Sequence, residues 1–317
     1  MNDLILALDF GGTKLSAAVL ERDALRNEQP RWFDLRREYT PHGADAAYEL
    51  AAMLRLARQV LSDRVPAAVG VSFGGPVDFA TGTVRLSHHV AGWESFPLPD
   101  RLQREFGAPA VVDNDANAAA LCEHRFGAGR GVDDLMYVTV STGVGGGWVL
   151  GGRAWRGHNG MAGEIGHTVV DPDGPLCLCG KRGCVERLAS GPYMAADYEA
   201  EKGRSGEREQ RSESSVAGLT GKDVAERAAA GDPLAAKILM RGARALGVGL
   251  GNAANLLNPQ RFVLGGGVTK SGEAWWEEVR RTARATALPE VAFDIVSAML
   301  GDDAPLWGSV ALAEAVQ

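Results

Sequence analysis

The stretch LILALDFGGTKLSAAVL, residues 4–20, contains the pattern that decides the fold. Leu4 to Leu8 predicts a buried strand, Gly11-Gly12 a tight turn, and Leu15 to Leu20 a returning strand. A similar strand–turn–strand pattern runs from Met136 to Leu150 around the glycine-rich sequence STGVGGG. We interpret the two patterns as an internal duplication, which predicts two halves that face each other across a cleft.

Strands and helices alternate along the rest of the chain, which places it in the α/β class. Helical spacing of apolar residues predicts helices at residues 44–61, 116–125, 223–230, 233–257, 274–287 and 306–315. Short apolar runs predict strands at residues 67–72, 111–113, 261–264 and 292–296. The polar stretch 199–215 lacks periodicity and predicts a surface loop or mobile insertion. We expect a small lobe at 1–115, with a C-terminal helix within 300–317 returning to it, and a large lobe at 116–299.

The composition limits the possible partners. A length of 317 residues suggests roughly two domains. The formal charge of −7 argues against nucleic acid as the main partner. No apolar run approaches the roughly 20 residues needed to span a bilayer. The N-terminus lacks a basic leader, so we expect a cytoplasmic protein with no membrane partner.

A cluster of cysteines predicts a metal site. The sequence GEIGH ends at His167, and CLCGKRGCVE begins at Cys177. Three of the four cysteines, Cys177, Cys179 and Cys184, lie within eight positions, and with His167 they form a complete tetrahedral set for structural zinc. The alternative is a disulfide plus a free thiol, which a long intracellular chain disfavours.

Two acidic residues near this cluster are not needed to bind the metal. Glu164 precedes His167, and Glu186 follows Cys184. Carboxylates are strong acceptors for sugar hydroxyls, so we expect both to bind a polar ligand. The metal would hold one ring nitrogen of His167 and leave the other to donate to a ligand or acceptor. The alternative is that the metal only pins a long loop.

Three glycine-rich turns follow predicted strands and suggest a nucleotide site. Bare backbone lets N–H groups approach an anion, and a carboxylate at a strand end can hold hydrated Mg²⁺. In DFGGTK these groups are Asp9, Gly11, Gly12, Thr13 and Lys14; in STGVGGG they are Thr142 and Gly143; and in LGGG, Gly265 and Gly266 would lie under an adenine or ribose. Taken alone, each turn is equally explained as a plain hairpin or a strand-to-helix turn.

The sequence VVDNDANAAA, residues 111–120, places two acids around Asn114 where a strand ends and a helix begins. Either Asn114 or Asp115 is expected to cap that helix. A capped helix start also holds a carboxylate rigidly, so Asp115 is a candidate general base beside a sugar hydroxyl. Phosphoryl transfer needs such an acceptor together with in-line positioning and Mg²⁺. We interpret Asp113 as structural.

Together these motifs resemble the ROK family of bacterial sugar kinases and related repressors. The likeness runs nearly end to end, and its motifs stand in the family's order: DFGGTK, GGP at 74–76, NDAN, STGVGGG, GEIGH, CLCGKRGCVE and LGGG. The CxCGKxGCxE form and Gly92-Trp93 are most similar to the glucokinase branch. The chain departs from it at Ser87-His88-His89, where the branch often has an asparagine, and at Ser141, where a glycine is common.

The resemblance implies an actin-like, ribonuclease H-like ATPase fold with two lobes around a central cleft. It also implies ATP and Mg²⁺ as the phosphoryl donor system, structural Zn²⁺, a hexose phosphorylated on its 6-hydroxyl, and a homodimer or homotetramer. By position, Asp115 would be the catalytic base. The sugar would contact Gly75, Asn114, Asp115, Glu164, His167 and Glu186, and the zinc, phosphate and nucleoside residues would be those named above.

Three functions follow from this resemblance. The first is phosphorylation of glucose to glucose 6-phosphate. The second keeps the chemistry but uses N-acetylglucosamine, N-acetylmannosamine, mannose or fructose. The third is a non-catalytic sugar sensor or repressor, which we disfavour because the chain is acidic and its phosphate motif begins at Asp9, leaving no length for an N-terminal DNA-binding module.

Overall fold

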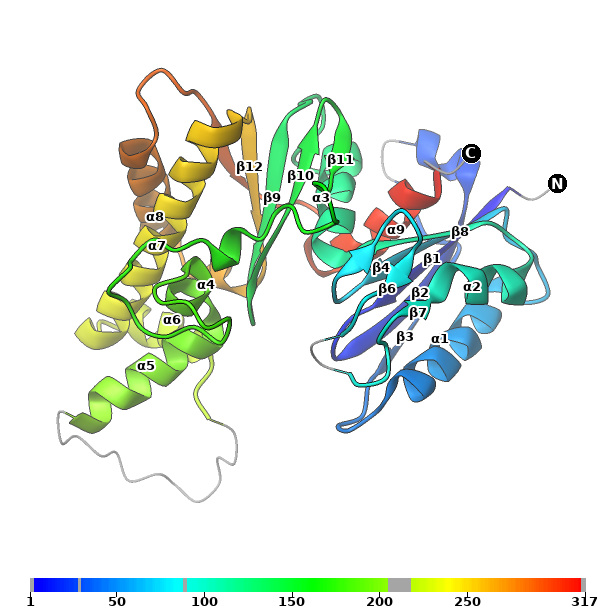
Figure 1. The fold of residues 1–317 in the computed structure, drawn as a ribbon, viewed down its shortest axis with the longest axis horizontal. Coiled ribbons are helices and arrows are strands. Elements are labelled where there is room, and N and C mark those ends of the chain that lie inside the picture. The colour runs from blue at the N-terminus through cyan, green and yellow to red at the C-terminus, as the bar shows by residue number, and fades with distance from the viewer. Residues whose placement is uncertain (1–2, 28–29, 88–89, 205–217, 315–317) are drawn as a thin grey trace. The chain divides into compact units, whose positions relative to one another are not determined.

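A computed structural model describes residues 3–27, 30–87, 90–204 and 218–314 of the chain. The chain forms two compact units (Figure 1). Unit 1 comprises Met1–Gly131, Gly147–Ala162 and Met299–Gln317, and unit 2 comprises Val132–Gly146 and Gly163–Ala298.

This division differs from the expected boundary at residue 115. The helix that follows residue 115 belongs to unit 1, as does the segment Gly147–Ala162. The physical reason is close packing between these two segments. A Cβ at Gly147 would lie 2.5 Å from the carbonyl oxygen of Ala116, so only glycine permits this approach.

The five-stranded sheet of unit 1 brings three motifs to one edge. Its order is β3 (Asp34–Tyr39), β2 (Lys14–Glu21), β1 (Leu4–Phe10), β4 (Ala68–Phe73) and β8 (Ala110–Asn114). Strand β4 is parallel to both β1 and β8, and Phe73 pairs with Phe10 on one side and Asn114 on the other. The carboxyl ends of the three strands therefore meet at one edge of the sheet, where DFGGTK, GGP and NDAN begin.

Helices cover this sheet. They are α1 (Ala46–Leu61), α2 (Leu98–Phe106), α3 (Asp115–Phe126) and α9 (Ala304–Glu314). Helix α9 packs on β1 and β4, and the hydroxyl of Ser309 donates to the carbonyl of Leu8 at 2.8 Å. The approach is close enough that a Cβ at Gly70 would lie 1.7 Å from the carbonyl oxygen of Ser309. The C-terminal helix is thereby fixed on the N-terminal sheet.

The conspicuous Gly92-Trp93 pair serves the core of unit 1. The Trp93 side chain is fully buried, and its ring contacts Phe10, Phe73 and Phe96 edge-on. Its indole N–H donates to the buried carboxylate of Glu49 at 2.8 Å, which satisfies the polar end of the ring. Short elements complete the unit: η1 (Arg22–Arg26), β5 (Val77–Asp78), β6 (Thr83–Val84), β7 (Phe96–Pro97), β11 (Arg153–Trp155) and η4 (Gly301–Asp303).

The second five-stranded sheet has the order β11, β10 (Val144–Leu150), β9 (Leu135–Val140), β12 (Arg261–Gly265) and β13 (Asp294–Ser297). The boundary between the units falls within β10. Strand β12 is parallel to β9, and Gly265 pairs with Thr139. The two glycine motifs that follow β9 and β12 therefore leave the sheet at the same edge.

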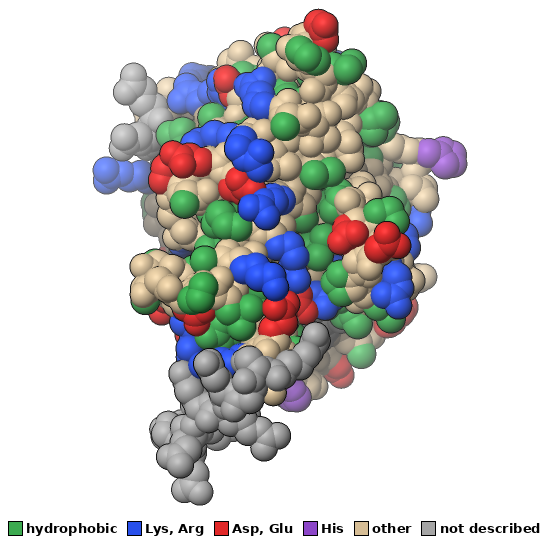
Figure 2. Space-filling model, turned by 90° about the vertical axis from the view of Figure 1, so that its left-hand side faces the viewer, with side chains coloured by type: hydrophobic (Ala, Val, Ile, Leu, Met, Phe, Trp, Pro, Cys, Tyr) green, Lys and Arg blue, Asp and Glu red, His purple; other side chains and the backbone are tan. Residues whose placement is uncertain are grey.

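Helices form most of unit 2. They are α4 (Val185–Ala189), α5 (Gly191–Arg204), α6 (Gly221–Ala229), α7 (Pro233–Leu257) and α8 (Glu273–Thr286), with η2 (Ile165–His167) and η3 (Gly267–Lys270). Helices α7 and α8 lie side by side (Figure 1). A Cβ at Gly247 or Gly251 would lie 2.6 or 2.5 Å from the Cβ of Thr282 or Thr286, so these glycines set the spacing. Figure 2 shows basic and acidic side chains interleaved on one face.

Most predicted elements are present, with shifts of a few residues at their ends. The predicted helix 233–257 coincides with α7. The predicted loop 199–215 is wrong in its first part, because α5 continues to Arg204; residues 205–217 lie outside the described residues. Residue Ala315, the predicted end of the last helix, also lies outside them. Among the described helices, none is both long and apolar enough to cross a membrane.

Candidate functional site

The first glycine turn, residues 11–14, lies at the polar edge of the sheet of unit 1. It closes by a 3.1 Å bond from Gly11 N–H to the carbonyl of Lys14. The preceding Asp9 is 7% exposed. Burial is the main cause that raises the pKa of Asp9 to about 7, and the negative charge of Asp115 contributes to that rise. A buried carboxylate near a second one and beside bare backbone fits a cation such as Mg²⁺.

Asn114 fixes the start of α3. Its side-chain oxygen accepts from the N–H groups of Ala116 and Asn117, so Asn114 is the cap, one of the two expected alternatives. Its amide nitrogen donates to the carbonyl of Gly75 at 3.1 Å and to Asp115 Oδ1 at 3.0 Å. Gly75, Asn114 and Asp115, which the family resemblance assigns to the sugar, are thus linked within one hydrogen-bonded group.

Asp113 is buried and hydrogen-bonds to Asn114 of this group. Its Oδ1 accepts from Asn114 N–H and from the Asn117 amide, and its Oδ2 pairs with the Arg156 guanidinium at 2.7 Å. Burial raises the pKa of Asp113, and the Arg156 charge opposes that rise. The Arg156 guanidinium also stacks 3.4 Å from the centre of the Phe79 ring. These contacts agree with the structural role that the sequence suggested for Asp113.

The four predicted zinc ligands come together in unit 2. One donor atom from each of His167, Cys177, Cys179 and Cys184 can be chosen so that all lie within 4.8 Å of one another. All four cysteines of the chain are free, and the Sγ atoms of Cys179 and Cys184 are 3.5 Å apart, too far for a disulfide.

The donor set fits a structural zinc ion. The buried Nδ1 of His167 has no hydrogen-bond partner among the described residues. The N–H of Lys181 is the main cause that lowers the pKa of Cys179 to about 7, which favours the thiolate that a metal requires. Backbone bonds shape the loop: Cys177 N–H donates to Lys181, and Val185 N–H donates to Thr168. Spacing in the sequence and these bonds together produce the cluster.

The second glycine turn, residues 141–144, contacts the segment of chain that follows the metal ligand Cys184. Glu186 Oε2 accepts from the N–H of Val144 at 2.9 Å. Gly191 N–H donates to the carbonyl of Ser141 at 2.9 Å, and Ser141 N–H donates to the carbonyl of Gly143. Glu164 is exposed. Glu186 is therefore the acidic residue near the metal cluster whose carboxylate accepts a hydrogen bond from the turn.

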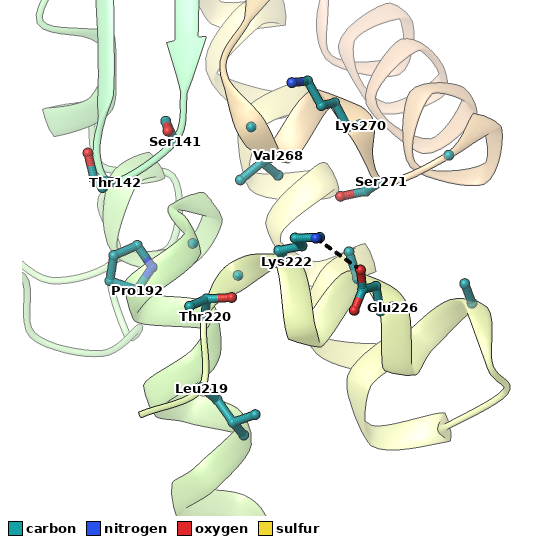
Figure 3. A pocket seen from close by; sticks show the side chains of 16 residues that line it. Ser141, Thr142, Pro192, Leu219, Thr220, Lys222, Glu226, Val268, Lys270 and Ser271 are labelled. Carbon is teal, nitrogen blue, oxygen red and sulfur yellow. Dashed lines mark ion pairs between the residues drawn. The ribbon is translucent and has the colours of Figure 1, made fainter. Parts of the chain in front are cut away.

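A cavity of 670 Å³ lies beside this turn, within unit 2 (Figure 3). Its wall is largely apolar, and it is lined by the second glycine turn, the start of α5, the segment that enters α6, and η3. Ser141, Thr142, Pro192, Val268 and Lys270 are among the lining residues. Lys222 and Glu226 of α6 form an exposed ion pair of 3.5 Å at its edge. The volume and lining suit a nucleoside.

The sequence did not assign the α6 side of this cavity, where Leu219, Thr220, Ala225 and Ala229 contribute to the wall. The sequence feature that could have indicated this helix is a capping box at its start. The side chains of Thr220 and Asp223 each accept a hydrogen bond from the other residue's backbone N–H. This box marks a helix start, but nothing local says that this helix faces Gly267. His88 and His89, left open as sugar contacts, lie outside the described residues.

Comparison with known proteins gives the family. The family model described as the ROK family matches residues 5–316. The chain belongs to the ROK family. It is 40% identical over 248 residues to a glucokinase of Halalkalibacterium halodurans, with 76% of this chain and 74% of the relative covered. It is 35% identical to an N-acetylmannosamine kinase of Citrobacter koseri, with 98% of each chain covered.

A solved structure confirms the fold. A ROK family glucokinase from Streptomyces griseus, in complex with glucose and AMPPNP, superposes with a TM-score of 0.80. The two sequences are 34% identical, and the match covers 98% of this chain and 99% of that one. The predicted actin-like, ribonuclease H-like ATPase fold is therefore confirmed for this member of the ROK family.

Proposed function

We propose that the protein transfers the terminal phosphoryl group of ATP to the 6-hydroxyl of a hexose, with glucose as the preferred substrate. The observation that carries this proposal is the rigid carboxylate of Asp115, held by Asn114 and Ala116 N–H at the sheet edge where the first glycine turn begins. The glucokinase relative and the Streptomyces griseus glucokinase support ATP and glucose as the substrates.

In the proposed mechanism Asp115 accepts the proton of the hexose 6-hydroxyl as the oxygen attacks phosphorus. Asn114 and the backbone at Gly75 orient the sugar, and Glu164, His167 and Glu186 accept or donate to its other hydroxyls. A site built from hydroxyl acceptors rejects ligands that lack those hydroxyls, because its polar groups would be left unpaired. Positioning of this kind supplies most of the catalysis in phosphoryl transfer.

The nucleotide would be bound by both glycine turns. Gly11, Gly12, Thr13 and Lys14 would face its phosphates, as would Thr142 and Gly143. Gly265 and Gly266 would lie near the nucleoside; they immediately precede Gly267, which lines the cavity together with α6 and the rest of η3. The cavity's apolar wall supports this assignment, because a nucleobase is a flat and largely apolar group.

Two metal ions belong to the proposal. His167, Cys177, Cys179 and Cys184 would hold a zinc ion that fixes the loop. Asp9 would hold Mg²⁺, which when bound neutralises phosphate charge. A cytoplasmic location, which the sequence analysis led us to expect, and a homodimer or homotetramer, which the family resemblance implies, are both proposals.

A coupled assay of ADP production over a panel of sugars tests the proposed function. We expect glucose to give the highest kcat/KM. A higher value for N-acetylmannosamine would favour the second candidate, which the Citrobacter koseri relative supports. Failure to phosphorylate any monosaccharide, with zinc and magnesium nucleotide present, would contradict both.

Replacement of the proposed base gives the sharper test. We expect Asp115→Ala to lower kcat by roughly 1,000-fold while the dissociation constant for glucose changes little, because general-base catalysis acts in the transition state. Isothermal titration with glucose checks binding, and the coupled assay checks turnover. Turnover within about threefold of the parent protein would remove Asp115 from the mechanism.

A further inference from the structure

The two spare carboxylates beside the metal cluster differ in what they contact. Glu164 is exposed and precedes η2. Glu186 is partly buried in the first turn of α4, and its Oε2 accepts from Val144 N–H at 2.9 Å. A hydrogen bond to an ionised acceptor is roughly twice as strong as a neutral one. Glu186 therefore fixes the backbone of the second glycine turn, whereas no side-chain hydrogen bond joins Glu164 to any of the residues that the structure describes.

The contact between Glu186 and the turn leaves no spare room. A Cβ added at Gly143 would lie 2.8 Å from Glu186 Oε2, so the carboxylate sits directly against the backbone of the turn. A glycine at residue 143 is what allows this approach. Thr142 and Gly143, which we assign to the phosphates, immediately precede the N–H that Glu186 holds.

Two further contacts brace the same turn from the same segment of chain. A Cβ at Gly166 would lie 1.9 Å from the carbonyl oxygen of Val144, so η2 packs directly on the turn. Gly191 N–H holds the carbonyl of Ser141 at 2.9 Å. Gly166 adjoins the metal ligand His167, and Glu186 lies two residues after the metal ligand Cys184. The turn is thus shaped from outside by the segment that carries the metal cluster.

From these contacts we infer that Glu186 is a positioning residue for the nucleotide phosphates, acting through the backbone of residues 141–144, in addition to any contact with the sugar. The inference rests on the proposed function, since it takes this turn as a phosphate site. A carboxylate has two oxygens, so Oε2 can hold Val144 N–H while Oε1 accepts from a sugar hydroxyl. Glu186 then links the two substrates: the hexose orders the carboxylate, and the carboxylate orders the turn.

The test is nucleotide affinity measured without any sugar, by isothermal titration of the full-length protein with a non-hydrolysable ATP analogue and Mg²⁺. We expect Glu186→Ala to raise the dissociation constant by about tenfold, the size expected for loss of one charge-assisted hydrogen bond. The matched control is Glu164→Ala, because Glu164 is exposed and, among the described residues, no side-chain hydrogen bond joins it to the turn. We expect it to leave nucleotide affinity within about twofold and to weaken only sugar binding.

A second variant keeps the test decisive if Glu186→Ala disturbs the metal loop. Glu186→Asp retains the charge but is one methylene too short to reach Val144 N–H, so we expect a similar loss of nucleotide affinity with normal zinc content by elemental analysis. Nucleotide affinity unchanged in a zinc-containing Glu186 variant, with sugar affinity reduced, would overturn the inference and leave Glu186 as a sugar ligand alone. If the parent protein itself bound no nucleotide, the proposed function would fail instead.

Discussion

The two glycine turns look alike in sequence but are held in different ways. The first, residues 11–14, is closed by its own backbone and by neighbouring strands: Gly11 N–H bonds Lys14, and Gly74 N–H bonds Phe10. The second, residues 141–144, is held by Glu186, Gly166 and Gly191, which lie 20 to 50 residues further along the chain. Both turns have a bond within their own backbone, and the first also receives a backbone bond from Thr40 N–H to Thr13, whereas the second is braced by the Glu186 side chain and by the segment that carries the metal cluster.

Loss of the metal should give the largest difference between the two turns, because it should loosen the second turn and leave the first unchanged. We expect Cys179→Ser to lose zinc, to lower the thermal midpoint by about 10 °C or more, and to weaken nucleotide binding, because metal binding contributes directly to folding. Hydrogen exchange followed by mass spectrometry should rise in residues 141–147 and stay unchanged in residues 10–14. Equal protection of both turns after zinc loss would show that the second turn needs no brace.

A smaller effect is expected when a side chain is added at Gly166, where η2 packs on the second turn. We expect Gly166→Ala to destabilise the protein by about 1–3 kcal/mol, because the new Cβ would lie 1.9 Å from the carbonyl of Val144 and one of them must move. Denaturant unfolding and nucleotide titration measure the two consequences. The matched change in the first turn is Gly11→Ala, whose Cβ would lie 2.9 Å from the Lys14 carbonyl and should be milder. The reverse order would contradict the comparison.

The smallest effect on stability, and of opposite sign, is expected at Asp9 beside the first turn. Its pKa rises from 3.8 to about 7 on folding, so the folded chain binds more protons than the unfolded chain between these pH values. Stability from this group therefore falls as the pH rises through that window.

Replacing Asp9 with a side chain that does not titrate should abolish this fall in stability with rising pH. We expect Asp9→Asn to raise the thermal midpoint by about 2–4 °C near pH 8, with the gain shrinking toward pH 4. The same variant should lower kcat/KM by roughly 100-fold, because the Mg²⁺ ligand is lost. Thermal scans across pH check the first effect. A gain that is independent of pH would show that the ionisation of Asp9 does not destabilise the fold.

The sequence was most informative where a motif acts on its own neighbours. The spacing of Cys177, Cys179 and Cys184 predicted their clustering with His167, and Asn114 caps the helix that follows it. It was least informative where contacts join distant segments. Nothing local indicates that Arg156 pairs with Asp113, or that α6 and η3 line one cavity.

The sequence by itself determined the α/β class, the order of the motifs, the metal donor set and the carboxylate offered as a base. These follow from residue type and local spacing, which act over a few positions of the chain. Only the tertiary structure decided that Glu186 rests on the second glycine turn and that Gly166 and Gly191 brace it. Such contacts depend on how separate segments pack, and close packing is a property of the folded chain and not of any one stretch.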